Sequence, residues 1–216
     1  MKSIIFANGD PHAGTMVQRV LDQASEALII AADGGVRVAD FFEISLDIVI
    51  GDMDSVDLNR LAELAQTGVE VQQHPAEKKQ TDLELALLLA VERGADWIRI
   101  VGGVGDRLDQ TLSNVYLTAL PELRTLDVRL VSGEQEAWLL QDHETHIHGQ
   151  AGDTLSLLPL TGEVTGVKTE NLYYPLEYET LYFGPARGIS NVLKASHASV
   201  RVDNGVLLVI HTVGRA

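Results

Sequence analysis

Through the first 131 residues, short β-branched apolar runs alternate with longer stretches whose apolar residues recur every three or four positions. The short runs are typical of strands, and the longer stretches are typical of amphipathic helices. Repeated strand–helix units predict a mainly parallel, Rossmann-like α/β sheet with helices on both faces. The predicted strands are residues 3–7, 27–31, 47–50, 69–73, 97–101 and 127–131, and the predicted helices are residues 15–24, 36–42, 57–66, 81–93 and 110–120.

The helix predicted at residues 81–93 has the clearest signals. It begins with Thr81-Asp82-Leu83-Glu84, which is a capping-box sequence, and an almost wholly apolar run follows. A helix of this composition is buried on most of its circumference.

The pattern changes after Gly133 to short apolar runs that are separated by Gly, Pro and Asn turns. No convincing helix follows, which favours a small all-β sandwich in which Asp203-Asn204-Gly205 forms a hairpin turn. The predicted strands are residues 136–140, 154–158, 164–168, 180–183, 192–196, 199–202 and 206–212. We therefore predict two domains, an α/β domain at residues 1–132 and a β-sandwich domain at residues 133–216.

The charge balance excludes some classes of partner. The chain has 31 acidic and 16 basic side chains and a net charge of −15, whereas binding to a nucleic-acid backbone needs a surplus of Lys and Arg. It contains no cysteine, which agrees with a reducing compartment. The apolar run at residues 3–7 is far shorter than a signal-peptide core or a membrane span. We therefore expect a cytoplasmic protein that binds neither nucleic acid nor a membrane.

Acidic, glycine-rich segments follow three of the predicted strands. They are Asp33-Gly34-Gly35, residues 51–55 and residues 102–109, and Asp82 adds a carboxylate at the start of a helix. Ligands of open α/β sheets bind beyond the carboxyl ends of the strands, so we expect these carboxylates to share one edge of the sheet. Carboxylates gathered in this way repel one another unless a cation lies among them, and hard oxygen ligands favour Mg²⁺.

Two common phosphate-binding loops are missing from the sequence. It has no Gly-x-x-x-x-Gly-Lys-Ser/Thr loop, and Gly103-Val104-Gly105 lacks the third glycine of a dinucleotide-binding fingerprint. The glycines of the acidic segments do allow the backbone to approach a phosphate closely. We therefore predict that a nucleotide is held by metal and by glycine-rich turns.

Several segments, in the same order along the chain, resemble those of the thiamine pyrophosphokinase family. In the first domain these are Asp33-Gly34-Gly35, residues 51–55 (Gly-Asp-Met-Asp-Ser), Thr81-Asp82 and Arg107-Leu108-Asp109. In the second domain they are Tyr174-Pro175-Leu176, Phe183-Gly184 and Gly188-Ile189-Ser190-Asn191. Each motif is weak alone, but their order along an α/β half and a β half is specific.

The resemblance implies transfer of a pyrophosphoryl group from ATP to the hydroxyl of thiamine, which gives thiamine diphosphate and AMP. Such a transfer needs positioning and charge neutralisation more than covalent help from the protein. The implied metal ligands and catalytic residues are Asp52, Asp54 and Asp82, with one or two Mg²⁺ ions, and Arg107 compensates negative charge. The implied nucleotide-binding residues are Asp33, Gly34, Gly35, Thr81, Gly102, Gly103, Arg107 and Asp109. Which carboxylate accepts the alcohol proton stays open.

The resemblance also implies that the second domain binds thiamine and forms a homodimer, with the site near the subunit boundary. Ser190 and Asn191 are the candidate polar contacts to the thiamine ring. The side chains of Tyr173, Tyr174, Tyr178 and Tyr182 either wall the ring or pack within strands.

Two positions depart from the common bacterial pattern of this family. Lys79 stands where an Asp usually precedes the Thr-Asp pair by two residues, so a positive charge lies beside the proposed metal site. Gln110 stands where a His often follows the Arg-x-Asp element.

The sequence is also compatible with two other functions. Residues 47–56 read as a strand followed by Asp-x-Asp-x-Val, which is typical of haloacid-dehalogenase-like phosphatases and would make Asp52 a nucleophile. A non-catalytic sensor of thiamine diphosphate or nucleotide is the second alternative, and the positive charge of Lys79 motivates it.

Overall fold

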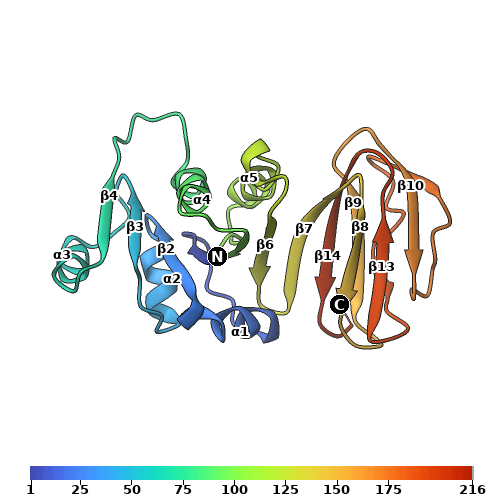
Figure 1. Ribbon diagram of the computed structural model, residues 1–216, viewed down its shortest axis with the longest axis horizontal. Coiled ribbons are helices and arrows are strands. Elements are labelled where there is room, and N and C mark those ends of the chain that lie inside the picture. The colour runs from blue at the N-terminus through green and yellow to red at the C-terminus, as the bar shows by residue number, and fades with distance from the viewer. Residues whose placement is uncertain (216) are drawn as a thin grey trace. The chain divides into compact units, whose positions relative to one another are not determined.

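A computed structural model describes residues 1–215 of the chain. It divides into two compact units, Met1–Gly133 and a second unit that begins at Glu134 (Figure 1). The first unit is α/β and the second is all β, which confirms the predicted fold class. Among residues 1–215, no helix is both long and apolar enough to cross a membrane.

Parallel strands form the sheet of the first unit, in the order β6–β5–β1–β2–β3–β4. The strands are β1 (Lys2–Phe6), β2 (Ala27–Ala32), β3 (Ile48–Gly51), β4 (Glu70–Gln73), β5 (Trp97–Val101) and β6 (Asp127–Ser132). The helices are α1 (Thr15–Leu21), α2 (Gly35–Phe41), α3 (Leu58–Gln66), α4 (Asp82–Glu92) and α5 (Leu108–Leu117), with 3₁₀ turns at Ala24–Glu26 and Pro121–Leu123. Each of these strands and α-helices overlaps one that the periodicity predicts.

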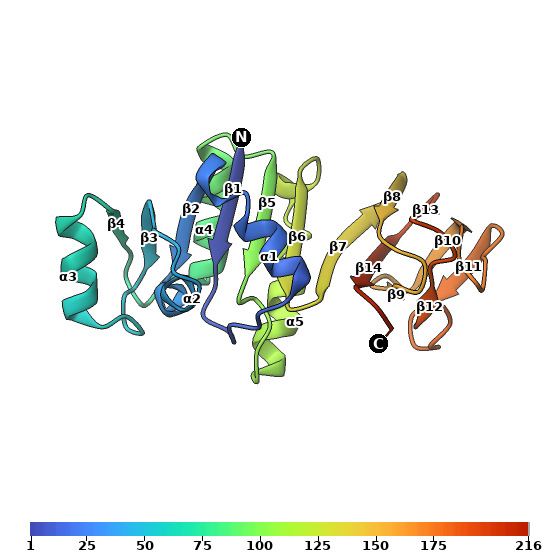
Figure 2. The same cartoon turned by 90° about the horizontal axis from the view of Figure 1, so that it is seen from below.

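Helices cover both faces of this sheet. Ile4, Ile5 and Phe6 are consecutive in β1 and all fully buried, as are Ile30 and Ala31 in β2, so both faces of these strands are dry. Helices α1 and α2 lie on one face, and α4 and α5 lie on the other (Figures 1 and 2). The strand ends are therefore held firmly in place between two layers of helices.

Helix α4 begins at the carboxyl edge of the sheet. The hydroxyl of Thr81 accepts a hydrogen bond from the backbone N–H of Glu84 at 3.2 Å, which confirms the predicted cap. Leu83, Leu87 and Ala90 are buried, and the helix packs against β2 and β3. Burial and capping together fix the position of its first residue, Asp82.

Two antiparallel sheets form the second unit, with strand orders β12–β9–β14–β7 and β11–β10–β13–β8. Buried side chains from both sheets, such as Leu157 and Val209 from one and Ile147 and Val200 from the other, share one core, which makes a sandwich. The strands are β7 (Gln135–Gln141), β8 (Glu144–His148), β9 (Thr154–Pro159), β10 (Glu163–Glu170), β11 (Glu179–Tyr182), β12 (Asn191–Val192), β13 (His197–Arg201) and β14 (Val206–Thr212).

Several details of the second unit differ from the prediction. The strand predicted at residues 192–196 is confined to Asn191–Val192. Strand β13 pairs with β8 and β10, whereas β14 pairs with β7 and β9, so Asp203-Asn204-Gly205 connects two sheets and the predicted hairpin turn is wrong. Strand β8 is absent from the predicted strands, because Ile147 is its only apolar residue. A local turn sequence does not encode which strands pair, since pairing is decided by burial of the two faces.

Candidate active site

The carboxyl edge of the parallel sheet carries acidic residues from three separate segments. Asp33 directly follows β2, and Asp52 directly follows β3. Asp82 is the first residue of α4, which packs against the same two strands. The topology therefore brings together residues that lie far apart in the sequence.

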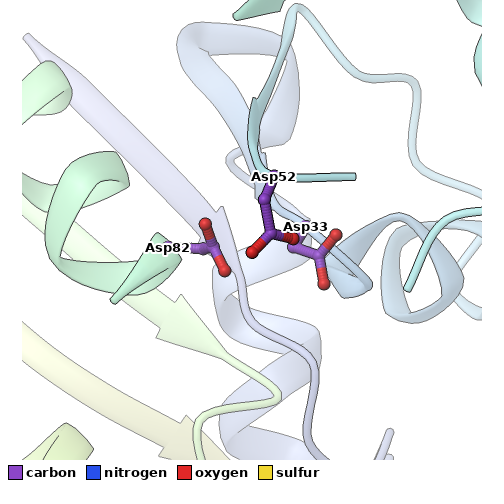
Figure 3. Close-up of side chains that lie close together, drawn as sticks. All are labelled: Asp33, Asp52 and Asp82. Atoms are coloured by element: carbon purple, nitrogen blue, oxygen red, sulfur yellow. The ribbon is translucent and has the colours of Figure 1, made fainter. Parts of the chain in front are cut away.

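The side chains of Asp33, Asp52 and Asp82 form a carboxylate cluster. Each offers one oxygen, and these oxygens lie within 4.8 Å of one another; Figure 3 shows the three side chains close together. Asp33 is only 6% exposed, and Oδ1 of Asp82 is buried and accepts no well-aligned hydrogen bond from the described residues. Close, poorly satisfied carboxylate oxygens are unfavourable unless a cation compensates them. Since hard oxygen donors are the ligands of Mg²⁺, the cluster fits the metal that the sequence predicts.

A left-handed backbone helps to aim the cluster. Asp33 has a φ of 45° and Met53 a φ of 66°, a conformation that non-glycine residues adopt rarely and Asp tolerates better than most. The N–H of Asp33 donates to the carbonyl oxygen of Ile50 at 2.9 Å, which ties the end of β2 to the end of β3. Such a conformation costs about 1–3 kcal/mol and persists because the surrounding structure enforces it.

Lys78, in the loop between β4 and α4, brings a positive charge to this cluster. Its Nζ lies 2.8 Å from Oδ1 of Asp82 and 3.5 Å from Oδ2 of Asp52, and its side chain is 12% exposed. Burial opposes the charged form, but the carboxylates of Asp82 and Asp52 raise the pKa of Lys78 above its ordinary value. The backbone N–H of Asp54 lowers the pKa of Asp52; burial opposes this effect and Lys78 adds to it. Both groups are therefore charged at neutral pH.

The sequence patterns do not indicate a role for Lys78, and they point to the adjacent Lys79 instead. Lys79 is exposed and is not among the described residues that line the cavity of this site. The positive charge beside the carboxylates therefore comes from Lys78. Lys79, which replaces the Asp common in bacterial members of the family, has an exposed side chain.

A cavity of about 600 Å³ opens over the cluster, and all its lining residues belong to the first unit. This volume lies within the range of about 300–1,000 Å³ that is usual for small-molecule sites. From the predicted set it is lined by Asp33, Asp52, Asp54, Thr81, Asp82, Gly103 and Arg107. The sequence did not indicate Asn8, Asp10 and Asn114, which also line it. Their polar side chains follow β1 or lie on α5, positions that become neighbours only in the folded sheet.

Family models match the two units separately. The model described as "Thiamin pyrophosphokinase, catalytic domain" matches residues 18–130, and "Thiamin pyrophosphokinase, vitamin B1 binding domain" matches residues 140–207. The chain belongs to the thiamin pyrophosphokinase family.

Relatives within this family share the sequence weakly and the fold strongly. Thiamine pyrophosphokinase of Bacillus subtilis is 27% identical over 163 residues, which is 75% of this chain and 76% of the relative. Thiamine pyrophosphokinase 1 of Arabidopsis thaliana is 27% identical over 175 residues, 76% of this chain and 64% of the relative. The crystal structure of the Bacillus subtilis protein has a TM-score of 0.86 at 26% identity and covers 99% of both chains. That of the yeast protein, at 13% identity, has a TM-score of 0.79 over 98% of this chain and 86% of the yeast chain, and so shows the shared fold.

The two alternative functions find no support in these comparisons. Both halves of the chain match models of the thiamin pyrophosphokinase family. The phosphatase-like sequence at Asp52 is the loop after β3, where Asp52 lies beside Asp33 and Asp82.

In this family member, the carboxylate cluster differs from the predicted metal ligands in one residue. The prediction named Asp52, Asp54 and Asp82, whereas the structure groups Asp33 with Asp52 and Asp82. Asp54 lines the same cavity, but its Oδ1 accepts a hydrogen bond from the hydroxyl of Ser55 at 2.8 Å. A left-handed turn at Met53 lies between Asp52 and Asp54.

Arg107 and Asp109 form an ion pair at the start of α5. Nε of Arg107 donates to Oδ1 of Asp109 at 3.1 Å, and a second guanidinium nitrogen bonds Oδ2. Both side chains are largely exposed, and Arg107 lines the cavity. Asp109 therefore restrains the guanidinium at the entrance instead of facing the cavity itself.

Two of the predicted nucleotide-binding glycines serve close packing in this fold. A Cβ at Gly35 would lie 1.9 Å from the carbonyl oxygen of Phe6, so glycine lets α2 approach β1. Gly102 has a φ of 73°, and a Cβ there would lie 2.5 Å from the carbonyl oxygen of Ala7. These two and Gly34 are not among the described cavity-lining residues, whereas Gly103 is.

The candidate thiamine-side residues lie in the second unit and are held differently from each other. Asn191 is buried, and its amide accepts from the N–H of Tyr174 at 3.0 Å and donates to the carbonyl oxygen of the same residue at 2.7 Å. Ser190 is exposed, and its backbone N–H donates to the hydroxyl of Ser156. The second unit also carries strongly exposed aromatic side chains: Tyr173, Tyr174, Tyr178, Tyr182 and Phe183.

Proposed function

We propose that this chain catalyses Mg²⁺-dependent transfer of a pyrophosphoryl group from ATP to the hydroxyl of thiamine, giving thiamine diphosphate and AMP. The observation that carries the proposal is the carboxylate cluster of Asp33, Asp52 and Asp82 under a ligand-sized cavity, in a chain of this family. In the reaction, the hydroxyl oxygen of thiamine bonds to the β-phosphorus of ATP. The bond from that phosphorus to the α-phosphate oxygen breaks, and AMP leaves.

The residues of the cavity have distinct roles in this proposal. Asp33, Asp52 and Asp82 hold the metal, with Asp54 beside them, and Mg²⁺ neutralises the phosphate charge when bound. Arg107, restrained by Asp109, compensates further negative charge at the entrance. Thr81 and Gly103 line the nucleotide region, and Thr81 also fixes the start of α4. The alcohol proton passes to one of the cavity carboxylates.

A product analysis tests the reaction. The protein is incubated with ATP, Mg²⁺ and thiamine, and nucleotides and thiamine esters are separated by chromatography. Equal amounts of AMP and thiamine diphosphate are expected. Formation of ADP and thiamine monophosphate would refute the pyrophosphoryl step. Release of phosphate from simple monoesters would support the phosphatase hypothesis instead.

A pair of variants ties the activity to the cluster. Asp52→Asn removes a cluster carboxylate and is expected to abolish most AMP formation, whereas Asp22→Asn, at an exposed position just after α1, leaves it unchanged. Equal activity of the two variants would contradict the assignment of Asp52 to the active site.

For the second unit we propose thiamine recognition and homodimer formation. The match to the vitamin B1 binding model and the exposed aromatic side chains of this unit support this. Because the amide of Asn191 is occupied by Tyr174, we assign Asn191 to holding that segment and Ser190 to the polar contact. Light scattering of the purified protein measures the oligomeric state, and a monomer that is fully active contradicts the dimer. Residence in the cytoplasm stays a prediction, which microscopy of the tagged protein tests.

A further inference from the structure

We propose that Lys78 is the resident counter-ion of the carboxylate cluster, and that a divalent cation and a nucleotide bind cooperatively because both require Lys78 to move. This inference rests on the proposed function for the identity of the nucleotide. It goes beyond that function by assigning the coupling between the two ligands to one side chain.

The first step is where the ammonium lies. It is 2.8 Å from Oδ1 of Asp82 and 3.5 Å from Oδ2 of Asp52, which are two of the three carboxylates within 4.8 Å of one another. The side chains of all three interacting residues are mostly buried, at 12% exposed for Lys78, 16% for Asp52 and 25% for Asp82. An ion pair at this depth is screened little by salt, so the ammonium neutralises part of the cluster charge.

The second step is competition. A divalent cation held by Asp52 and Asp82 needs the same carboxylate oxygens that the ammonium now contacts, and two cations cannot occupy one coordination site. Entry of the metal therefore requires the Lys78–Asp82 contact to break. Breaking it alone gives up the ion contacts of Lys78 with no new partner for the ammonium in the cavity, which costs free energy and weakens binding of the metal by itself.

The third step is compensation by the nucleotide. Lys78 lines the cavity, so its four-carbon stem can carry the ammonium from the carboxylates to a phosphate without a change in the fold. A phosphate is a good partner for an ammonium. Metal bound to the cluster thus releases Lys78, and nucleotide bound in the cavity takes it up. Each ligand then raises the affinity for the other by the same factor.

The adjacent lysine supplies a matched control. Lys79 has the same charge and lies in the same loop, but it is exposed and outside the described lining of the cavity. Lys78→Met and Lys79→Met remove the same charge and keep a similar length of apolar stem. A difference between the two variants therefore reports the position of the ammonium and not the net charge of the protein.

The test measures binding of Mn²⁺, as a paramagnetic probe for the metal, by the electron paramagnetic resonance of the free ion. It is done with and without ATP and in the absence of thiamine, so that no turnover occurs. For the wild type and Lys79→Met, we expect ATP to tighten Mn²⁺ binding at least tenfold beyond the affinity of ATP itself for the ion. For Lys78→Met, we expect Mn²⁺ alone to bind about tenfold more tightly than to the wild type, and most of the tightening by ATP to disappear.

Two outcomes would overturn the inference: Lys78→Met binds Mn²⁺ alone no more tightly than the wild type, or it keeps the full effect of ATP. If Lys78→Met does not fold, as judged by circular dichroism, Lys78→Gln replaces it. The wild type provides a further measurement, by nuclear magnetic resonance of protein labelled with ¹⁵N-lysine. Without metal, one side-chain ammonium signal should be protected from exchange with water. Addition of Mg²⁺ and ATP together should change the chemical shift of this signal. Absence of that signal also contradicts the inference.

The same data separate this inference from the proposed function. If no Mn²⁺ binds to the wild type even with ATP, the metal site fails and with it the proposed function. If Mn²⁺ and ATP bind cooperatively through Lys78 but no AMP forms with thiamine, the coupling stands and the reaction is wrong.

Discussion

The two units of the chain each bury a carboxylate, and they treat it in opposite ways. In the second unit, Asp153 is 4% exposed, and its oxygens accept hydrogen bonds from the N–H groups of Gly214 and Gln150 and from the ring of His211, at 2.8 to 3.0 Å. In the first unit, Asp33 is similarly buried, but among residues 1–215 its side chain accepts one long bond, from the N–H of Ser55 at 3.4 Å, and it lies beside two further carboxylates. An acid whose oxygens are hydrogen-bonded to the backbone stabilises the fold, whereas a group of acids balanced mainly by the side chain of Lys78 stays available to a ligand.

The largest expected effect is on catalysis, in the carboxylate cluster of the first unit. Asp82→Asn removes one charge that the metal requires, so turnover at saturating Mg²⁺ should fall by at least about a hundredfold. The free energy of unfolding should change far less, because the loss of like-charge repulsion offsets the loss of the contact with Lys78. Rates of AMP formation and urea denaturation measure the two effects. Near-normal turnover would contradict the assignment of Asp82 to the metal.

The next effect is on stability, in the satisfied acid of the second unit. Asp153→Ala deprives His211 and two backbone N–H groups of their acceptor, and should lower the free energy of unfolding by about 3 kcal/mol. The exposed pair of Lys168 and Glu170 provides the control, since Glu170→Ala should cost less than about 1 kcal/mol. Urea denaturation compares the variants. A loss for Asp153→Ala no larger than that of the control would show that the hydrogen bonds of Asp153 do not stabilise the fold.

The pH dependence of stability sharpens the same contrast. Burial opposes ionisation of Asp153, but the N–H groups of Gly214 and Gln150, and then His211, lower its pKa below the ordinary value. A lowered pKa in the folded state stabilises the fold above the unfolded pKa of about 3.9, and this stability is lost as the pH falls through the folded pKa. The stability difference between the wild type and Asp153→Asn should therefore be full near pH 7 and shrink below about pH 4. A difference that grows in acid would reverse the sign of the shift.

The smallest expected effect separates capping from chemistry in the first unit. Thr81→Ala removes the cap of α4 and should cost about 1 kcal/mol of stability. Asp57 caps α3 by accepting from the N–H groups of Asn59 and Arg60, so Asp57→Ala should cost a similar amount. Only Thr81 lines the cavity and fixes Asp82, so only its variant should also raise the Michaelis constant for ATP. If Thr81→Ala and Asp57→Ala have equal effects on the Michaelis constant for ATP, Thr81 acts only as a helix cap.

Much of the fold was open to prediction because periodicity reports burial. All the strands and α-helices of the first unit were found from apolar spacing, and the cap of α4 was read from Thr81 and Glu84. The turn at residues 203–205 misled because turn residues report local backbone preference and not the pairing partner. Strand β8 was missed because a strand with one apolar residue has almost no pattern to detect.

The site was predicted at the level of the sheet edge and not at the level of side chains. The topology rule placed the acidic segments together, but the cluster contains Asp33 where the predicted metal ligands include Asp54. The left-handed turn at Met53, between Asp52 and Asp54, has no signal in the sequence. Lys78 was missed because a lysine in a polar loop looks solvated. Its burial depends on Asp52, just after β3, as well as on Asp82, four residues along the chain, and no local pattern shows that Asp52 lies beside this loop.

The left-handed conformation of Asp33 leaves this position almost no acceptable replacement. Its φ of 45° favours Gly, Asn and Asp, while the cluster requires a carboxylate. Asn and Gly adopt the left-handed backbone but have no carboxylate. Glu has the carboxylate, but its backbone adopts this conformation rarely. Directed evolution that starts from any substitution at residue 33 would therefore meet a barrier in one direction or the other, and only reversion would restore both properties at once.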